Sequence, residues 1–197
     1  MNNTLSNKIP KITLYELTTV IKNGLSSYYI NAGAVTTYLV NVKDIQNGRI
    51  NADKVEVVKV KETEALDKNR LEKGDLVVTA KGQNFKAAVA MKDVEGYVIS
   101  ANLIALKLNG HVDPELVAAY LNNPLGQREI NARAAGGIVK GLNCKGLLEI
   151  PIPVPPIEKQ KVLVEYLRLI NEYSEVLEKE QMLVDRIRNS IISDIMG

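Results

Sequence analysis

A short polar connection near the middle of the chain contains four side chains that can form hydrogen bonds with DNA. These side chains are Lys81, Gln83, Asn84 and Lys86. The amides can pair with the N6/N7 edge of adenine, and a lysine can reach guanine O6/N7 or a phosphate. The connection lies between two apolar stretches, 75–80 and 87–91, so we expect a hairpin tip. It is therefore a candidate DNA contact, although loops of this composition are more often simply solvated.

A second candidate group surrounds the glycine-rich loop 136–141. Its basic and polar members are Arg133, Lys140, Asn143 and Lys145. Glycines allow a backbone to approach a phosphate closely, and the flanking cations would add attraction. Solvation of a flexible loop is again the alternative. The two groups together form our predicted DNA-binding set.

Catalytic motifs are not apparent in the sequence. His111 and Cys144 are the single histidine and cysteine, and two residues so far apart predict neither a catalytic dyad nor a zinc site. No G-x-x-x-x-G-K-[ST] phosphate loop occurs. The stretch 122–125 (Asn-Asn-Pro-Leu) superficially resembles an amino-methyltransferase loop, but it lacks the second proline and the aromatic residue. We interpret it as a helix-ending turn, and expect a protein without a catalytic site, metal or cofactor.

Composition places the chain among ordinary globular proteins. Its 197 residues are 46% hydrophobic and 24% charged, and no apolar run approaches the roughly 18 residues that span a membrane. Residues 1–150 carry 19 Lys and Arg against 15 Asp and Glu, whereas residues 151–197 carry 6 against 8. A mildly basic body fits contact with nucleic acid, and a mildly acidic tail fits contact with protein. The single cysteine and the absence of an apolar leader predict a cytoplasmic location.

The segment 147–156 has the pattern of an edge strand that leads directly into a helix. Prolines occupy every second position from Pro151 to Pro155, with Ile or Val between them. Alternate residues of an extended chain direct their N–H groups to the same edge. The prolines thus remove donors from one edge, and leave the other edge able to pair. Pro156 suits the first position of the helix that follows.

That helix carries a row of apolar residues in alternating steps of four and three. This row, which we call the seam, consists of Leu163, Tyr166, Ile170, Tyr173, Leu177, Val184, Ile187 and Ile191, with a break at Glu180. Seven-residue spacing over four repeats is typical of a coiled coil. At 1.5 Å per residue the helix would be about 55–60 Å long. We expect a second chain to cover the seam; the alternative is a helix packed along its own domain.

The first 150 residues predict a mixed α+β body. Helices are expected at 12–21, 66–73, 114–123 and 125–135, the third with Asp113 as N-cap and Pro114 at its first position. Strands are expected at 36–42, 54–60, 75–80, 87–91 and 97–108, the last with a break near Asn102. The stretch 137–145 is expected to be a loop that leads into the proline-marked strand.

Five segments resemble the specificity subunit of type I restriction–modification systems. They are YLVNVKDIQNGRI (38–50), GDLVVTAKG (74–82), ISANLIALKLN (99–109), VDPELVAAYLNN (112–123) and LLEIPIPVPPIEKQKVLVEYL (147–167). The last is the most specific, because it joins an Ile/Pro-rich strand, a Pro-Pro pair, an acidic residue, Gln160 and a long helix. The resemblance covers nearly the whole chain from about Ile12.

In that family a target recognition domain reads half of a split DNA sequence through the major groove, and a long spacer helix follows it. Spacer helices pack together, fix the distance between half-sites and dock the modification subunits. The resemblance thus implies a target recognition domain in residues 1–150 and a spacer and dimerisation helix, with its leading strand, in residues 151–197. It also implies double-stranded DNA and DNA adenine methyltransferase subunits as partners, with a restriction subunit (a nuclease and translocase) as a further candidate.

The chain departs from the family in one respect. Members typically carry two recognition domains and two spacer helices, whereas this chain has one of each. It is either a natural half-subunit that forms a homodimer or one part of a longer protein. We favour the homodimer, whose two-fold axis would predict a palindromic, interrupted target. The alternative function is a protein–protein adaptor that oligomerises through its C-terminal coiled coil without reading DNA.

Overall fold

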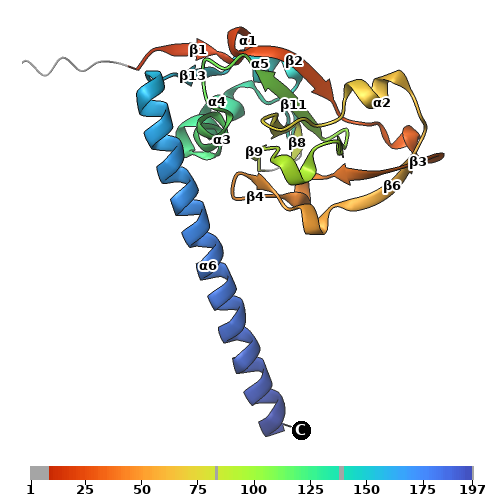
Figure 1. Ribbon diagram of the computed structural model, residues 1–197, viewed down its shortest axis with the longest axis vertical. Coiled ribbons are helices and arrows are strands. Elements are labelled where there is room, and N and C mark those ends of the chain that lie inside the picture. Colours follow the sequence, from red (N-terminus) through yellow and green to blue (C-terminus); the bar gives the residue numbers. More distant parts are fainter. Residues whose placement is uncertain (1–8, 83, 138–139, 197) are drawn as a thin grey trace, which may run out of the picture.

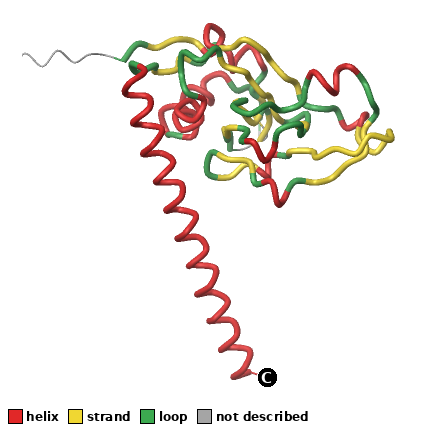
Figure 2. The backbone as a smooth tube through the Cα atoms, viewed as in Figure 1, coloured by secondary structure: helices red, strands yellow, loops and turns green. Residues whose placement is uncertain are grey.

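The computed structural model describes residues 9–82, 84–137 and 140–196. It consists of a mixed α/β body and one long helix, α6 (Ile157–Met196), that leaves the body at one corner and projects far beyond it (Figure 1). Figure 2 shows most of the strands on the side of the body away from this helix, whereas the strand pair formed by residues 11–13 and 151–153 lies beside its first turns. The predicted fold class, an α+β body with mostly antiparallel pairing followed by a long helix, is confirmed.

Within the described residues the strands form four sheets. The largest has the spatial order β2 (Thr18–Asn23), β11 (Leu103–Leu108), β7 (Leu76–Thr79), β9 (Ala87–Val89), β5 (Arg49–Ile50) and β4 (Ile45–Gln46). A second sheet contains β10 (Val98–Ile99), β3 (Ile30–Val40) and β6 (Glu56–Val60). Two small ribbons pair β1 (Lys11–Thr13) with β13 (Pro151–Pro153), and β8 (Lys81–Gly82) with β12 (Lys140–Gly141). All pairs are antiparallel except β10 with β3 and β5 with β9.

The largest sheet is buried on both faces. Successive residues of a strand point to opposite faces, and in β7 Leu76 and Val78 join one apolar cluster while Val77 joins another. The first cluster lies against the short helices α1 (Leu14–Leu17), α3 (Pro114–Asn122), α4 (Pro124–Arg133) and α5 (Cys144–Leu148). A third cluster lies beneath the second sheet, and includes Leu66 of α2 (Glu64–Lys68). Most of the helices therefore cover the sheet face next to the root of α6.

Local capping explains where α3 and α4 begin. The Asp113 carboxylate accepts a hydrogen bond from the Glu115 N–H (2.9 Å), and Pro114 opens the helix, as predicted. The Asn123 side chain accepts from the Leu125 N–H (3.0 Å), so this residue ends α3 and caps α4. Side chains of this type satisfy N–H groups that have no partner within the helix. The interpretation of 122–125 as a helix-ending turn is confirmed.

The proline-marked strand also forms as predicted. It is β13, and β1 is its partner, with Ile12 opposite Ile152. The Val154 N–H donates to the Pro10 carbonyl (2.8 Å), so the edge between the prolines is the one that pairs. The helix begins one residue later than predicted. The Pro156 carbonyl accepts from the N–H groups of Lys159 and Gln160, which makes Pro156 the cap rather than the first helical residue.

Other predicted elements were wrong in type or extent. The segment 12–21 is not a helix: one turn, α1, capped by Thr13 and Glu16, lies between strands β1 and β2. Its second half is rich in β-branched residues, which favour strands. The segment 137–145 is not simply a loop, because it contains β12 and the start of α5. The break predicted near Asn102 is present, but it separates two strands, β10 and β11, that belong to different sheets.

A buried lysine joins several of these elements. Lys22 of β2 is 2% exposed, and its ammonium group donates to the Arg70 carbonyl, the Glu72 carboxylate and the Asp75 carboxylate, each at 2.8 Å. Hydrogen bonds from Lys107 and then Lys22 lower the pKa of Glu72 from 4.5 to about 2. The network holds the loop before β7 against strands β2 and β11. An isolated lysine would not be stable at this depth, because burial of a charge is costly unless it is paired.

Candidate nucleic-acid interface and helix seam

The two loops of the predicted DNA-binding set meet in space. Lys81 and Gly82 of β8 pair with Gly141 and Lys140 of β12, in antiparallel register. The Leu142 N–H donates to the Ala80 carbonyl (2.8 Å), which extends the contact by one residue. Segments almost sixty residues apart in sequence thus form one two-stranded ribbon. We call this feature the β8–β12 ribbon.

Several of the predicted residues present exposed polar groups on or beside the ribbon. Lys81, Asn84, Asn143 and Lys145 are exposed. Lys81 and Asn143 also line one shallow pocket of about 400 Å³, so the side chains of the two loops lie near each other. Lys140 is half-buried, and its ammonium group donates to the Asn131 side chain on α4 (2.9 Å). The exposed members form a surface that offers ammonium and amide groups to a ligand.

Two other predicted residues are engaged in contacts of their own. The Lys86 ammonium donates to the Ile45 carbonyl (2.9 Å) and lines a crevice next to α6. The Arg133 guanidinium binds Glu129 one turn earlier on α4 (2.7 Å). Gln83 lies outside the described residues. The ribbon, rather than the hairpin tip alone, is therefore where the predicted groups come together; none of their roles is tested by the fold itself.

The pocket beside the ribbon also contains the free cysteine. Burial raises the pKa of the Cys144 thiol. A thiol with a raised pKa stays protonated at neutral pH and is a poor nucleophile or metal ligand. Among the described residues, no group of three or more His, Cys, Asp or Glu side chains is arranged to hold a metal ion. What this surface offers is hydrogen-bond donors and positive charge.

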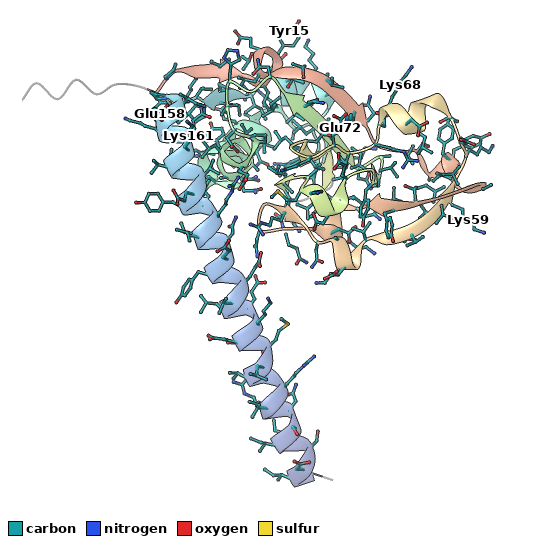
Figure 3. All side chains as sticks on the ribbon, in the orientation of Figure 1. Tyr15, Lys59, Lys68, Glu72, Glu158 and Lys161 are labelled. Atoms are coloured by element: carbon teal, nitrogen blue, oxygen red, sulfur yellow. The ribbon has the colours of Figure 1, made fainter. Side chains whose placement is uncertain are left out.

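The seam of α6 is open to solvent in the single chain. All eight of its residues are exposed, from 43% at Leu163 to 65% at Tyr173. Figure 3 shows side chains standing out around the lower part of α6, well away from the body. No helix within the described residues is long and apolar enough to cross a membrane. An apolar row of this length is typical of an interface.

A second apolar row lies beside the seam, and our sequence reasoning missed it. It consists of Val162, Leu169, Val176 and Leu183, each seven residues from the next and each about half exposed. Every member directly precedes a seam residue. In a heptad this row broadens the apolar face beyond the narrow stripe of a two-stranded coiled coil. The repeated pair of adjacent apolar residues was the signal that could have revealed it.

A different face of α6 packs on the body. Gln160 is 2% exposed: its amide donates to the carbonyls of His111 and Pro155 (2.9 Å each), and its oxygen accepts from the Asp113 N–H (2.9 Å). One turn later Val164 is also buried. The helix root is therefore fixed by buried hydrogen bonds to the start of α3. The alternative prediction, that the seam itself packs along the domain, does not agree with its exposure.

Comparisons with known proteins were consistent. The model of the family described as "Type I restriction modification DNA specificity domain" matches residues 8–182. A putative type I restriction enzyme MjaX specificity subunit from Methanocaldococcus jannaschii is 29% identical over 96 residues, which are 48% of this chain and 22% of that protein. The chain thus spans under a quarter of this relative's length.

Solved structures show the same fold. A chain from a structure on complex assembly and conformational transition of the type I R-M system aligns with a TM-score of 0.65 and 16% identity, covering 89% of this chain and 45% of that one. The HsdS subunit from Thermoanaerobacter tengcongensis aligns with a TM-score of 0.62 and 17% identity, covering 91% and 41%. The corresponding S subunit from M. genitalium gives 0.54 and 18%, covering 89% and 43%. The chain spans less than half of each.

Proposed function

Because the chain belongs to the family of type I restriction–modification DNA specificity domains, we propose that its body reads one half of a bipartite DNA target and that α6 acts as the spacer. In this proposal residues 1–150 are the target recognition domain, and residues 151–197 are the leading strand and spacer helix. The protein itself is non-catalytic and directs DNA adenine methyltransferase subunits to the site. A restriction subunit is a further partner of the assembled complex.

The β8–β12 ribbon is the observation that supports DNA reading by this chain. Two polar loops that look unrelated in sequence form one surface, with Lys81 and Lys140 on neighbouring strands. A two-stranded ribbon is narrow enough to enter the major groove of B-DNA. Exposed Asn84 can bond to base edges, and so can the side-chain NH2 group of Asn143, whose oxygen caps α5 by accepting from the Gly146 N–H. The lysines contact phosphates or guanine. We assign specificity to the amides and most of the affinity to the cations.

The open seam supports assembly through α6. Its apolar residues face away from the body, so a second copy can approach without displacing the hydrogen bonds of the helix root. A homodimer would place two bodies at opposite sides of a two-fold axis, and such symmetry predicts an inverted repeat interrupted by a spacer. The adjacent row from Val162 to Leu183 leaves apolar surface for the methyltransferase subunits. One continuous face of α6 would then serve both partners.

The test begins with selection of bound duplexes from a random-sequence pool, with the chain alone and with a DNA adenine methyltransferase subunit. We expect an enriched interrupted palindrome, and binding that weakens with added salt. Replacement of Lys81, Lys140 and Lys145 by Ala should reduce the slope of log affinity against log salt by about one for each phosphate that the variant no longer neutralises. Exposed Lys92 and Lys179, which lie outside the ribbon, provide the matched controls Lys92→Ala and Lys179→Ala.

Two outcomes would count against the proposal. An unchanged salt slope in the triple variant would move the DNA-reading surface elsewhere on the body. If the chain assembled with the methyltransferase subunit but neither form enriched any sequence, the adaptor alternative would replace DNA reading. Detection of a stable complex by size-exclusion chromatography with light scattering separates that second outcome from simple misfolding.

A further inference from the structure

The β4–β5 hairpin touches α6 far from the root of the helix. The Asn47 side-chain amide donates to the Glu178 carboxylate (2.9 Å), and the Arg49 guanidinium donates to the Glu175 carboxylate (3.4 Å). Because Glu178 is 18 residues beyond Gln160, at about 1.5 Å per residue this contact lies about 27 Å along the helix from its buried root. The hairpin and the helix are otherwise distant in sequence. Their contact is therefore a specific tertiary feature.

The tip of this hairpin is well defined. Its two central residues, Asn47 and Gly48, both have positive φ values, 48° and 76°, as the tight two-residue turn of a twisted hairpin requires. The strands pair in register, with Gln46 opposite Arg49, and β5 continues the pairing to β9 of the main sheet. Lys86 adds a hydrogen bond to the Ile45 carbonyl. The position of the tip is thus set by the main sheet.

Between the root and the hairpin tip, α6 bridges a crevice instead of resting on a core. The crevice has a volume of about 460 Å³ and is lined by residues of the hairpin, of β9, of α3 and of α6, among them Val89, Asn122 and Asn171. Along this span the Arg168 guanidinium holds the Glu115 carboxylate of α3 through both of its oxygens (2.6–3.2 Å). The helix is therefore supported at separate points, and the hairpin tip is the support farthest from the root.

We infer that the β4–β5 hairpin is a prop that sets the angle between α6 and the body, with Asn47 and Arg49 as its positioning residues. This inference rests on the proposed function, since the angle matters only if α6 separates two DNA-reading bodies. The prop binds acidic side chains of α6 and leaves the apolar seam open. By setting this angle, the prop determines the distance between the two DNA-reading bodies and therefore the spacing between half-sites that the assembly binds.

Because α6 is long, a small change in its angle to the body moves its far end by a large distance. From Gln160 to Ile195 the helix extends about 53 Å, so a tilt of about 10° about the root moves its far end by about 9 Å. B-DNA rises about 3.4 Å along its axis for each base pair, so that displacement corresponds to between two and three base pairs. A prop that restricts the tilt to a few degrees is needed to fix the spacing to one base pair.

The same contacts contribute little to folding. Arg49 and Glu175 are 36% and 46% exposed, and ion pairs at such exposure are weak. Loss of the prop should therefore leave the thermal unfolding midpoint nearly unchanged while it broadens the distribution of helix angles. This combination distinguishes a positioning role from a merely structural one.

The first experiment measures the angle without DNA. Nitroxide labels at exposed Lys92 of the body and Asn189 of α6, each changed to Cys in a Cys144→Ala background, are diluted with unlabelled chain, and the distance between them is measured by electron double resonance. The variant Glu175→Ala/Glu178→Ala removes both acceptors of the hairpin tip and should give a distance distribution at least twice as wide as the parent protein. The matched control Glu165→Ala/Glu172→Ala removes two exposed carboxylates from the same helix, and should leave the width unchanged.

A charge reversal provides the rescue. Arg49→Glu should broaden the distribution, and Arg49→Glu/Glu175→Arg should narrow it again by restoring the ion pair with opposite polarity. If both prop variants gave the parental width, the prop would be refuted, whatever the protein binds. Circular dichroism of each variant ensures that a broad distribution does not come from an unfolded helix.

The second experiment connects the angle to DNA. In selection from a random duplex pool, the parent protein should enrich half-sites at one spacing, and the prop variants should accept neighbouring spacings with less than tenfold discrimination. Unchanged spacing selectivity in these variants would overturn the inference while the proposed function stood. If the parent protein enriched no bipartite sequence, the proposed function would fail instead, and the prop would no longer have a role in spacing.

Discussion

Disruption of the seam gives the sharpest test of assembly through α6. We consider the double variant Ile170→Asp/Leu177→Asp, which places two carboxylates at central positions of the seam. Ile170 is 59% exposed and Leu177 is 46% exposed in the single chain. Neither side chain belongs to an apolar cluster of the body as the structure describes it, so the fold of the monomer should be retained.

The expected effect follows from the surface that these side chains would bury. Full burial of an Ile or Leu side chain contributes about 1.5–3 kcal/mol, and about half of that remains to be gained here, or about 1 kcal/mol for each side chain. Two positions on two helices give about 4 kcal/mol, which corresponds to about a thousandfold increase in the dimer dissociation constant. Desolvation of the new carboxylates would add to this loss.

Sedimentation equilibrium over a wide range of protein concentrations measures the dissociation constant. The control Gln181→Glu/Asn189→Asp adds the same charge to exposed polar positions of the same helix, and should dimerise like the parent protein. The reasoning is refuted if the seam variant dimerises as tightly as the control, or if the parent chain stays monomeric at tens of micromolar. Circular dichroism should show the same helix content in all three proteins.

Three further predictions concern the body and the root of α6. Lys22→Met should lower the free energy of unfolding, measured with urea, by about 3–5 kcal/mol, because it leaves the buried Asp75 carboxylate without its ion pair. The double variant Lys22→Met/Asp75→Leu should recover most of this stability. A decrease below about 1 kcal/mol in Lys22→Met would contradict the role of the pair. The pKa of Glu72 lies at about 2, below its ordinary 4.5, so its ionised form stabilises the fold fully above pH 4.5 and this contribution disappears as the pH falls toward 2. Since the side chain is half exposed, the loss should be at most about 1 kcal/mol, and Glu72→Gln should show a flatter pH profile of unfolding over that range than the parent. Gln160→Leu should cost about 3 kcal/mol, because it leaves one buried and two partly buried backbone groups without their partner; a thermal unfolding midpoint equal to that of the parent would show that water replaces the side chain.

Elements with strong local signals were predictable from sequence. Asp113 fixes the start of α3, because its carboxylate accepts a hydrogen bond from the N–H of Glu115, two residues later. The alternating prolines from Pro151 to Pro155 show which edge of β13 can pair, because a missing N–H is a local property. The long helix α6 was predictable from the regular spacing of its apolar residues, whereas the role of the seam as an interface stays a prediction. In each case the decisive interaction lies within a few residues of the chain.

The remaining features depend on contacts that a local pattern does not contain. The apolar residues of 12–21 fit a helix, yet the chain from Thr18 onward forms strand β2, because it pairs with β11, more than eighty residues away. No local pattern shows that Lys22 is buried, because its ion pair with Asp75 joins residues more than fifty positions apart. The ribbon between Lys81 and Lys140 is another long-range pairing. Its polar residues were recognisable as candidates one loop at a time, but their common surface was not.

The pairing of β1 with β13 brings the two ends of the body together. The chain enters the body beside Pro10 and leaves it beside Val154, and one hydrogen bond joins these two residues. A domain whose two ends lie together can be removed or inserted as a unit with little disturbance to what flanks it. The body can therefore be exchanged as a unit while the helix α6 stays the same. If the body reads DNA as proposed, a different body joined at the same two positions would change the DNA sequence that is recognised and would keep the same helix α6.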